Sequence, residues 1–337
     1  MKQFTLGIDI GGTKCAVVLG KAQIPPSQNE NFILDKQTFP TQTHIEPAHT
    51  IARLFEGADF LLHRHGITAA DLAGIGISCG GPLNHRTGVI CAPPNLYGWN
   101  NVPIVQLFEE RFHVPAYLQN DANACALAEW KFGAARGCSN IIFLTFGTGM
   151  GAGLILNGQL YCGLNDMAGE VGHMRISDNG PVGYGKIGSF EGFCSGNGIA
   201  QLAKSLAMEA LQKGHSPSFC PTIAQLDTLN AKKVAEAADL GDSLAIEIYR
   251  LCGESLGKGL AVLIDILNPE IIVLGSIFQR SPHLLWPAAK EVIAREALPQ
   301  SFRQCKIVPS ALGEHIGDYA AISIILSQLQ ENKSKPL

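Results

Sequence analysis

The sequence lacks three features that would each direct its interpretation elsewhere. Its ten cysteines include no CxxC pair, which argues against a disulfide scaffold or a paired-thiol redox site. No run of about 18 apolar residues occurs, so a membrane-spanning helix is not expected. The 25 Lys and Arg residues are interspersed with 29 Asp and Glu residues, without a basic stripe. We therefore expect neither nucleic acid nor a membrane as a partner.

We expect no secretion signal at the beginning of this sequence. Asp9 and Lys14 interrupt the only apolar stretch that could serve as its hydrophobic segment. We therefore expect a cytoplasmic protein whose cysteines are reduced thiols.

Glycine-rich turns and apolar segments are what the sequence has in abundance. The 337 residues are 46% apolar and include 37 glycines, enough for two domains with sizeable cores. Residues 4–19 read as two strands joined by a glycine turn, and a second copy follows in which residues 145–149 align with residues 9–13. This internal similarity predicts two related lobes.

Strands and helices alternate along the rest of the chain. Apolar runs predict buried strands at residues 72–78, 114–119 and 270–275. Helical spacing of apolar residues predicts helices at 48–66, 123–133, 198–214, 231–268 and 314–330. The fold class is therefore α/β with mixed sheets.

The two glycine turns are candidates to bind phosphate. Gly11, Gly12, Gly147 and Gly149 lack a Cβ, so their backbone N–H groups can approach phosphate oxygens closely. Asp9 ends an apolar strand just before the first turn, where a carboxylate needs a cation or hydrogen-bond donors. We interpret it as a ligand of Mg²⁺, held directly or through water. Capping of its own turn is the alternative, as ordinary strand-to-strand geometry is for the glycines.

The order of several segments resembles the ROK family of sugar kinases and sugar-responsive repressors. These segments are DIGGTK (9–14), GISCGGPLN (76–84), APPNLYGWNN (92–101), NDANACALAE (120–129), LTFGTGMGAG (144–153), AGEVGH (168–173), LNPEIIVLGS (267–276) and SALGEHIGDYAA (310–321). The resemblance implies an actin-like, hexokinase-like fold of two RNase H-type lobes with the sugar and the nucleotide in the cleft between them. We expect the smaller lobe to comprise residues 1–119 and about 318–332, and the larger lobe residues 120–317.

Asp121 resembles the family's catalytic base. It follows a predicted strand and opens a predicted helix, so it is also a good N-cap, and both roles can coexist. A helix N-terminus lowers the pKa of a carboxylate, which predicts an ionised Asp121 that acts mainly by orienting the attacking hydroxyl.

The resemblance also assigns binding residues. Those expected to hold the sugar are Gly81, Asn95, Asn120, Glu170, His173 and Glu191. Those expected to hold the nucleotide are Asp9, Gly11, Gly12, Thr13, Lys14, Gly147, Thr148, Gly149, Gly275 and Gly313. Family members often carry a second glycine where this chain has Ser276.

One segment departs from the family. Many ROK proteins bind structural zinc through the ExGH histidine and three cysteines in a CxCGxxGC pattern. Here Val182, Tyr184 and Ser189 stand at the cysteine positions, and Cys162 and Cys194 lie nearby without ligand spacing. We therefore expect no structural zinc, with Tyr184 and Phe190 helping to hold this loop by packing.

Together these features predict a kinase that transfers the γ-phosphoryl group of MgATP to the 6-hydroxyl of a hexose. Glucose is the first expectation, and N-acetylmannosamine or another N-acetylhexosamine the second. The alternative is a sugar-sensing regulator without catalysis, although such repressors carry an N-terminal helix-turn-helix and this chain reaches its first phosphate turn at residue 9. The family also suggests a homodimer or homotetramer.

Overall fold

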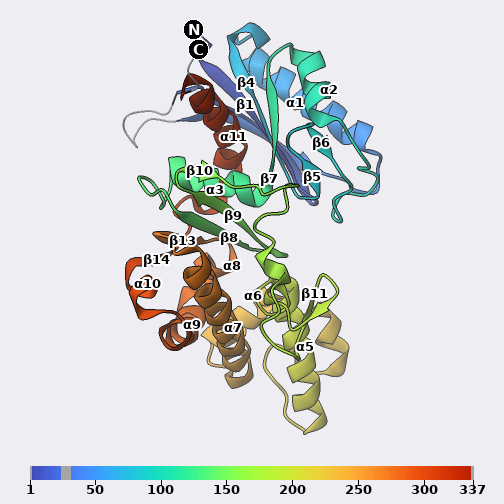
Figure 1. Ribbon diagram of the computed structural model, residues 1–337. Helices are drawn as coiled ribbons and strands as arrows, with labels where there is room; N and C mark the ends of the chain where they lie inside the picture. The colour runs from blue at the N-terminus through green and yellow to red at the C-terminus, as the bar shows by residue number, and fades with distance from the viewer. Residues whose placement is uncertain (1, 24–31, 335–337) are drawn as a thin grey trace. The chain divides into compact units, whose positions relative to one another are not determined.

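The computed structural model describes residues 2–23 and 32–334, without the side chains of residues 331–334. Two compact units make up the chain (Figure 1). The first unit comprises Met1–Arg136, Leu160–Ala168 and Glu314–Leu337, and the second comprises Gly137–Gln159 and Gly169–Gly313. Both contain helices and strands in mixed sheets, which confirms the predicted class. In the described part of the chain, no helix has the length and apolarity needed to cross a membrane.

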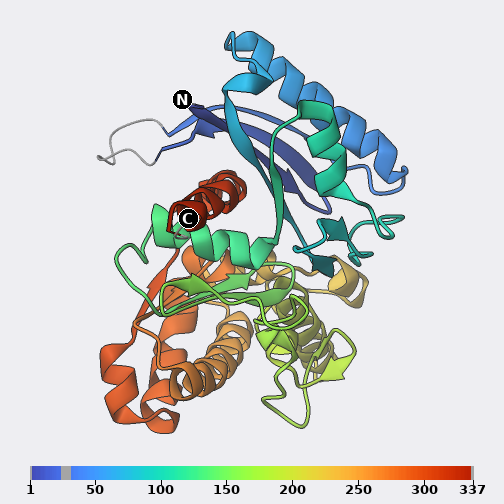
Figure 2. The same ribbon diagram turned by 45° about the horizontal axis from the view of Figure 1, so that its top comes forward.

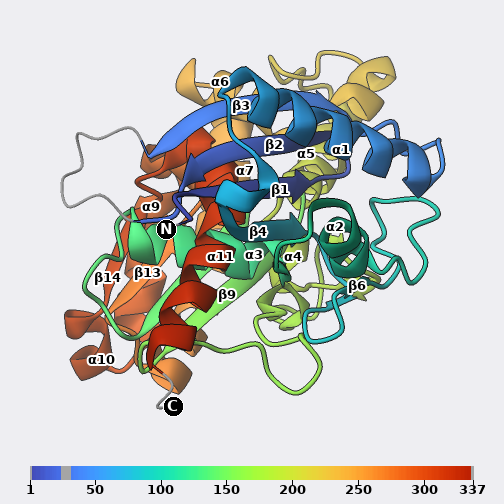
Figure 3. The ribbon, with the colours of Figure 1, turned by 90° about the horizontal axis from the view of Figure 1, so that it is seen from above.

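The first unit is a five-stranded sheet with helices on both faces. Its elements are β1 (Phe4–Ile10), β2 (Lys14–Lys21), β3 (Ile33–Pro40), α1 (Pro47–Arg64), β4 (Leu72–Cys79), β5 (Leu83–Asn84), β6 (Val89–Ile90), α2 (Ile104–Phe112), β7 (Ala116–Asn120), α3 (Asp121–Lys131) and α11 (Ile316–Ser334), with a short 3₁₀ turn, η1 (Ala69–Asp71). The strand order is β3-β2-β1-β4-β7. Seen from above, β3, β2, β1 and β4 lie side by side (Figure 3).

Apolar side chains on both faces explain why helices cover both sides of this sheet. Alternate residues of β1 and β2, such as Ile8 and Val17, pack with α1 and α2 in one core. The intervening Ala16 and Val18 pack with Ile322 of α11 in another. Figure 2 shows α1 and α2 on one side of the sheet and α11 on the other. β1 runs antiparallel to β2 and parallel to β4.

The second unit repeats this arrangement. Its elements are β8 (Ile141–Phe146), β9 (Met150–Leu156), β10 (Gln159–Leu160), η2 (Val171–His173), β11 (Val182–Gly183), β12 (Lys186–Ile187), α4 (Phe190–Phe193), α5 (Gly196–Gln212), η3 (Ile223–Thr228), α6 (Ala231–Asp239), α7 (Ser243–Leu267), β13 (Ile271–Leu274), α8 (Ile277–Arg280), α9 (Pro282–Glu296), α10 (Pro299–Gln304) and β14 (Lys306–Pro309). The 3₁₀ turn η4 (Gly313–His315) begins at the last residue of this unit and continues into the first. The strand order is β10-β9-β8-β13-β14. β8 pairs antiparallel with β9 and parallel with β13, as β1 does with β2 and β4, which confirms the internal repeat.

Two boundaries differ from the sequence expectation. The helix predicted over residues 231–268 is two helices, because Gly241 has a left-handed φ of 90° and the Asp242 side chain caps α7 by accepting from the amides of Leu244 and Ala245. The first unit also continues past the boundary expected near Gln119, since α3 packs against α11 and β7 of that unit.

Candidate functional site

A cavity of about 280 Å³ opens in the first unit at the carboxyl ends of β1, β4 and β7. The predicted residues that line it are Asp9, Gly11, Gly12, Gly81, Asn95 and Asp121. Residues far apart in the sequence meet here because β1, β4 and β7 are parallel neighbours. Thr13 in the adjoining turn and Lys14 at the start of β2 are exposed and do not line the cavity.

Asp9 is half-buried at the end of β1. Burial raises the pKa of its carboxyl to about 7, and the neighbouring carboxylates of Asp121 and Asp318 add to this rise. A hydrogen bond from the Ser78 hydroxyl and the charge of Lys36 act in the opposite direction. Lys36 forms a close ion pair with Asp318. Clustered carboxylate oxygens are the ligands that Mg²⁺ prefers, so the donor set fits this cation.

Asn120, and not Asp121, is the N-cap of α3. The Asn120 Oδ1 caps the helix by accepting from the amides of Ala122 at 2.9 Å and Asn123 at 3.4 Å. Asp121 is therefore the first helical residue and not the N-cap. Its Oδ1 accepts from the Ala122 amide at 2.8 Å, and its side chain is exposed.

The pKa of Asp121 is raised, so the expectation of a lowered value is wrong in direction. The surrounding protein atoms disfavour the charged form more than the Ala122 amide favours it. Water also reaches this exposed carboxylate, and we expect its hydration to limit the rise.

The first glycine turn is shaped by its own hydrogen bond and by a close neighbour. The Gly11 amide donates to the Lys14 carbonyl at 3.2 Å, which closes the turn. The amides of Gly12 and Thr13 come next and are the candidates to meet a phosphate. A Cβ on Gly12 would lie 2.8 Å from the Asn95 Cβ, so only glycine permits this approach. Contact between the turn and the Asn95 loop thus forms one wall of the cavity.

The cavity includes residues that the sequence analysis did not single out. Ser78, Gly80, Leu96, Cys125 and Gly317 line it as well. Gly317 comes from the far end of the chain, at the start of α11, where a Cβ would lie 3.2 Å from the Asp9 Oδ2. Ser78 lies next to Asp9 through the β1–β4 pairing. The segments 76–84 and 310–321, which contain Ser78 and Gly317, were the only sequence signal for these two positions.

The second glycine turn joins β8 to β9 in the second unit. The Gly147 amide donates to the Gly149 carbonyl at 3.1 Å, and Thr148 is exposed at the tip. The Gly147 carbonyl accepts from the Gly196 amide at 2.7 Å, which ties the turn to the start of α5. The first glycine of each turn therefore donates its amide across the turn, but to a carbonyl three residues later in the first turn and two residues later in the second.

The predicted sugar contacts of the second unit gather beside this turn. The Glu191 Oε2 accepts from the Met150 amide at 2.9 Å. The η2 turn packs against Glu191, since a Cβ on Gly172 would lie 3.1 Å from the Glu191 Cβ. This turn begins just after Glu170 and contains His173. Glu170 is exposed and His173 is half-buried.

The two glycines predicted to contact adenosine both lie in loops of the second unit. Gly275 follows β13, and a Cβ there would lie 3.1 Å from the Phe143 ring. Gly313 has a left-handed φ of 57° and lies beside Gln279 of α8. Ser276, next to Gly275, has φ 48° and ψ −104°. This conformation strains any residue with a Cβ, so glycine would fit this position with less strain than serine.

Hydrogen bonds and packing hold the loop that carries zinc ligands in many family members. The Gln201 side chain bonds both the amide and the carbonyl of Val182, at 3.1 and 2.9 Å. The Tyr184 ring contacts the His173 ring with centroids 5.1 Å apart, and Phe190 is fully buried, in line with the packing role expected of both aromatic residues. The Lys186 Nζ also donates to the His173 carbonyl at 2.6 Å.

Comparisons with known proteins find similar sequences among both glucokinases and xylose repressors. A glucokinase of Halalkalibacterium halodurans is 31% identical over 314 residues, which are 93% of this chain and 92% of that enzyme. A xylose repressor of Caldicellulosiruptor bescii is 30% identical over 263 residues, 78% of this chain and 64% of the repressor.

The fold matches solved structures as well. A ROK family glucokinase from Streptomyces griseus, in complex with glucose and AMPPNP, has a TM-score of 0.73 at 26% identity, covering 95% of this chain and 98% of that one. The chain thus has the actin-like ATPase fold of ROK sugar kinases. A model described as the ROK family matches residues 5–327, and the chain therefore belongs to the ROK family.

Proposed function

We propose that this ROK protein is an ATP-dependent sugar kinase that phosphorylates the 6-hydroxyl of a hexose. The observation that carries the proposal is the cavity of the first unit, where Asp121 lies with Asp9 beside the Gly11–Gly12 turn. A carboxylate that can orient a hydroxyl, a second that can hold a cation and a turn that can hold phosphate are the parts that phosphoryl transfer requires.

Asp121 would orient the attacking hydroxyl. Phosphoryl transfer through a loose transition state needs a positioned nucleophile more than a strong base. The Ala122 amide fixes one oxygen of Asp121, and its exposure leaves the carboxylate accessible to a hydroxyl. Its raised pKa also makes it a better proton acceptor than an ordinary aspartate.

Asp9 would hold Mg²⁺ directly or through water, with Asp121 and Asp318 adding negative potential. Bound Mg²⁺ would neutralise charge on the phosphates. The amides of Gly12 and Thr13 would donate to phosphate oxygens on the same side. In the second unit, the amides of Thr148 and Gly149 would do the same, and Gly275 and Gly313 would contact the adenosine.

The sugar would be recognised by hydrogen bonds with its hydroxyl groups. Asn95 lines the first cavity, and the Asn120 Nδ2 remains able to donate because its Oδ1 caps α3. Glu170, His173 and Glu191 would hold the hydroxyls near the anomeric end, as the resemblance to the family implies. We rank glucose first and N-acetylmannosamine or another N-acetylhexosamine second, since one or two hydrogen bonds decide between them.

A sugar-responsive regulator is the alternative function. It is favoured by the 30% identity to the xylose repressor of Caldicellulosiruptor bescii over 78% of this chain. A regulator of this kind would bind sugar tightly without turning it over.

The test is ADP release with MgATP and a panel of glucose, mannose, allose, fructose and N-acetylhexosamines. We expect turnover with a gluco- or manno-configured sugar and a product phosphorylated at the 6-hydroxyl. Asp121→Asn should lower kcat more than about tenfold, a loss above about 1.4 kcal/mol, while sugar affinity changes only a few-fold. Asp59→Asn is the control, because this exposed carboxylate pairs with Arg111 on the surface of the first unit.

Three results would reject the proposal. They are a product phosphorylated at the anomeric oxygen, tight binding of a sugar without turnover of any, and an Asp121→Asn variant that keeps more than about a tenth of wild-type kcat.

A further inference from the structure

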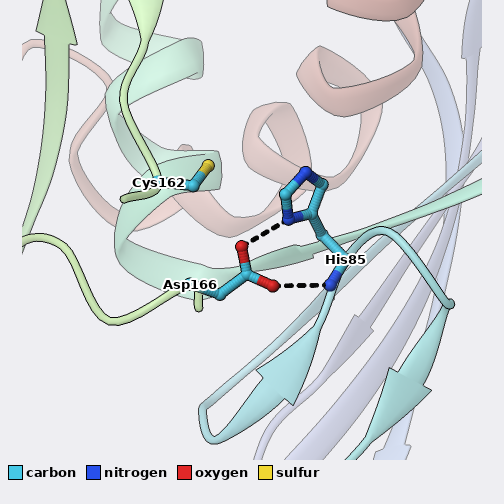
Figure 4. Close-up of side chains that lie close together, drawn as sticks. All are labelled: His85, Cys162 and Asp166. Carbon is cyan, nitrogen blue, oxygen red and sulfur yellow. Dashed lines mark hydrogen bonds and ion pairs between the residues drawn. The ribbon is translucent and has the colours of Figure 1, made fainter. Parts of the chain in front are cut away.

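Three potential metal ligands meet in the first unit, and none of them lines its cavity. His85, Cys162 and Asp166 each offer one ligand atom, and these atoms lie within 4.8 Å of one another (Figure 4). His85 lies in the turn between β5 and β6, whereas the other two lie in residues 160–168, the segment that returns to the first unit between two parts of the second. No role proposed above uses any of the three.

Asp166 is held in the orientation that a ligand would need. Its Oδ2 accepts from the His85 backbone amide at 2.8 Å, and its Oδ1 lies against the His85 Nδ1. The Asp166 side chain is only 7% exposed, and that of His85 is 29% exposed. One carboxylate oxygen is therefore fixed by the backbone amide, while the other is hydrogen-bonded to the imidazole nitrogen. A cation could replace the proton between them.

The sulfur of Cys162 receives two amide donors. The Gln119 Nε2 lies 3.5 Å from the Cys162 Sγ, and the Asn123 Nδ2 lies 3.7 Å from it. Both amides are buried and oriented, because the Gln119 Oε1 accepts from the Asn123 Nδ2 at 3.0 Å. Donors directed at a sulfur stabilise its thiolate, which is the form that binds a metal.

We propose that His85, Cys162 and Asp166 bind one Zn²⁺ ion. A nitrogen, a sulfur and an oxygen ligand suit this borderline cation, with water as the fourth ligand of a tetrahedral site. Mg²⁺ and Ca²⁺ take oxygen ligands and do not suit the thiolate and imidazole. Gln119 and Asn123 are the outer partners that orient the sulfur.

The ion would anchor a segment that buries little of its own apolar surface. Tyr161 is 51% exposed, Leu164 90% and Met167 47%. A segment of this kind gains little from the hydrophobic effect, so a metal bond to the β5–β6 turn would supply much of its stability. This site departs from the sequence expectation that the chain holds no zinc, and it shares no residue with the loop of residues 182–189.

The test uses the untagged full-length protein, stripped of metal and titrated with Co²⁺ and then Zn²⁺. We expect one Co²⁺ per chain with a thiolate-to-cobalt charge-transfer band and the visible bands of tetrahedral Co²⁺, both lost when Zn²⁺ displaces it. Cys162→Ser should abolish the charge-transfer band, and His85→Gln and Asp166→Asn should each weaken Zn²⁺ binding at least about tenfold. Cys138→Ser, which changes a half-buried cysteine of the second unit, is the control and should bind as the wild type does.

A second measurement needs no variant and therefore survives a failure to fold. Alkylation of Cys162 in the wild-type protein, followed by mass spectrometry, should slow at least about tenfold when Zn²⁺ is added, while alkylation of Cys138 should not change. Three results would each overturn the proposal. They are absence of the charge-transfer band in the wild type, variants that bind zinc as tightly as the wild type does, and equal alkylation of Cys162 with and without Zn²⁺. None of these results depends on kinase activity.

Discussion

Asp9 shows how a single carboxyl group can link stability to pH. Its pKa of about 7 lies well above the ordinary value of 3.8, because burial and two neighbouring carboxylates disfavour its charge. Between these two values the folded chain keeps a proton that the unfolded chain releases. The protonated Asp9 carboxyl therefore contributes its full stabilisation of the fold below about pH 4, and this stabilisation is lost as the pH rises through about 7.

We predict that Asp9→Asn will flatten this dependence in the metal-free protein. One bound proton changes the free energy of unfolding by at most about 1.4 kcal/mol per pH unit, so the wild type should lose stability between about pH 4 and pH 7 more steeply than the variant. Urea unfolding at each pH measures the slopes. Asp71→Asn is a control for the opposite pH dependence. The Thr68 amide lowers the pKa of Asp71, so the stabilisation that Asp71 contributes is lost only as the pH falls. Equal slopes in wild type and Asp9→Asn would contradict the prediction.

Ser276 illustrates backbone strain at a position where the sequence analysis expected glycine. Its φ of 48° with ψ of −104° costs a residue with a Cβ about 1–3 kcal/mol. Glycine removes this strain at an entropic cost of about 0.5–1 kcal/mol.

Ser276→Gly should therefore stabilise the protein by about 1 kcal/mol, measured from the midpoint and slope of urea unfolding. Ser301→Gly in α10, where the backbone is helical, should instead destabilise it by about 0.5–1 kcal/mol. A loss of stability in Ser276→Gly would mean that the serine hydroxyl contributes more than the strain costs.

At the residue scale, the sequence predicted positions whose chemistry is unusual for their surroundings. Asp9 at the end of an apolar strand is one, and the Gly11–Gly12 pair is another; both line the cavity. Gly317 could not be found in this way, since only the packing of α11 brings it near Asp9. The raised pKa of Asp121 was missed because desolvation by the surrounding protein atoms, which only the folded structure shows, outweighs the hydrogen bond from the Ala122 amide.

At the scale of elements, glycines allow α11 to lie unusually close to the first sheet. Cβ atoms on Gly7, Gly20 and Gly74 would come within 2.9 Å or less of Ile322 or Ile325 of α11. On Gly76, in β4, a Cβ would lie 2.0 Å from the Ala321 carbonyl oxygen. The helix backbone cannot yield as a side chain can, so this contact sets the distance between helix and sheet.

Gly76→Ala should destabilise the protein by about 3 kcal/mol or more, because the methyl group forces α11 away from β1 and β4. Thermal and urea unfolding measure the loss. The matched control is Gly57→Ala on α1, where the nearest atom is a Val17 methyl carbon at 3.2 Å that can move, and where alanine favours the helix. There we expect a change below about 1 kcal/mol. Similar effects of the two substitutions would show that the close approach at Gly76 is not important.

The sequence predicted elements better than their ends. Apolar runs identified β4, β7 and β13 because both of their faces are buried. The periodic pattern of residues 231–268 concealed the break between α6 and α7, since apolar residues continue at helical spacing across Gly241. The two glycine turns alone were enough to predict the internal repeat. In the structure, the five strands of the two sheets accordingly follow the same order.

At the scale of the molecule, the first unit is assembled from distant parts of the chain. Its sheet is complete at Asn120, yet α11, which covers one face, begins at Ile316. The second unit has its own core, which contains none of the α11 side chains that the structure describes, residues 316–330.

Removal of residues 316–337 should therefore unfold the first unit selectively. Hydrogen exchange resolved by peptide should show β1 and β4 amides exchanging at least about a hundredfold faster, while β8 and β13 amides keep their protection. Loss of protection in both sheets would mean that the two units do not fold separately.

The late position of α11 also has a consequence in time. Every residue of the second unit, from Gly137 to Gly313, is synthesised after the strands of the first sheet and before the helix that covers it. At the usual 5–20 residues per second, this interval lasts roughly 10 to 35 seconds. The glycine-lined face of the nascent sheet stays uncovered throughout, so a chaperone that shields apolar strands would act on this protein before its last helix has left the ribosome.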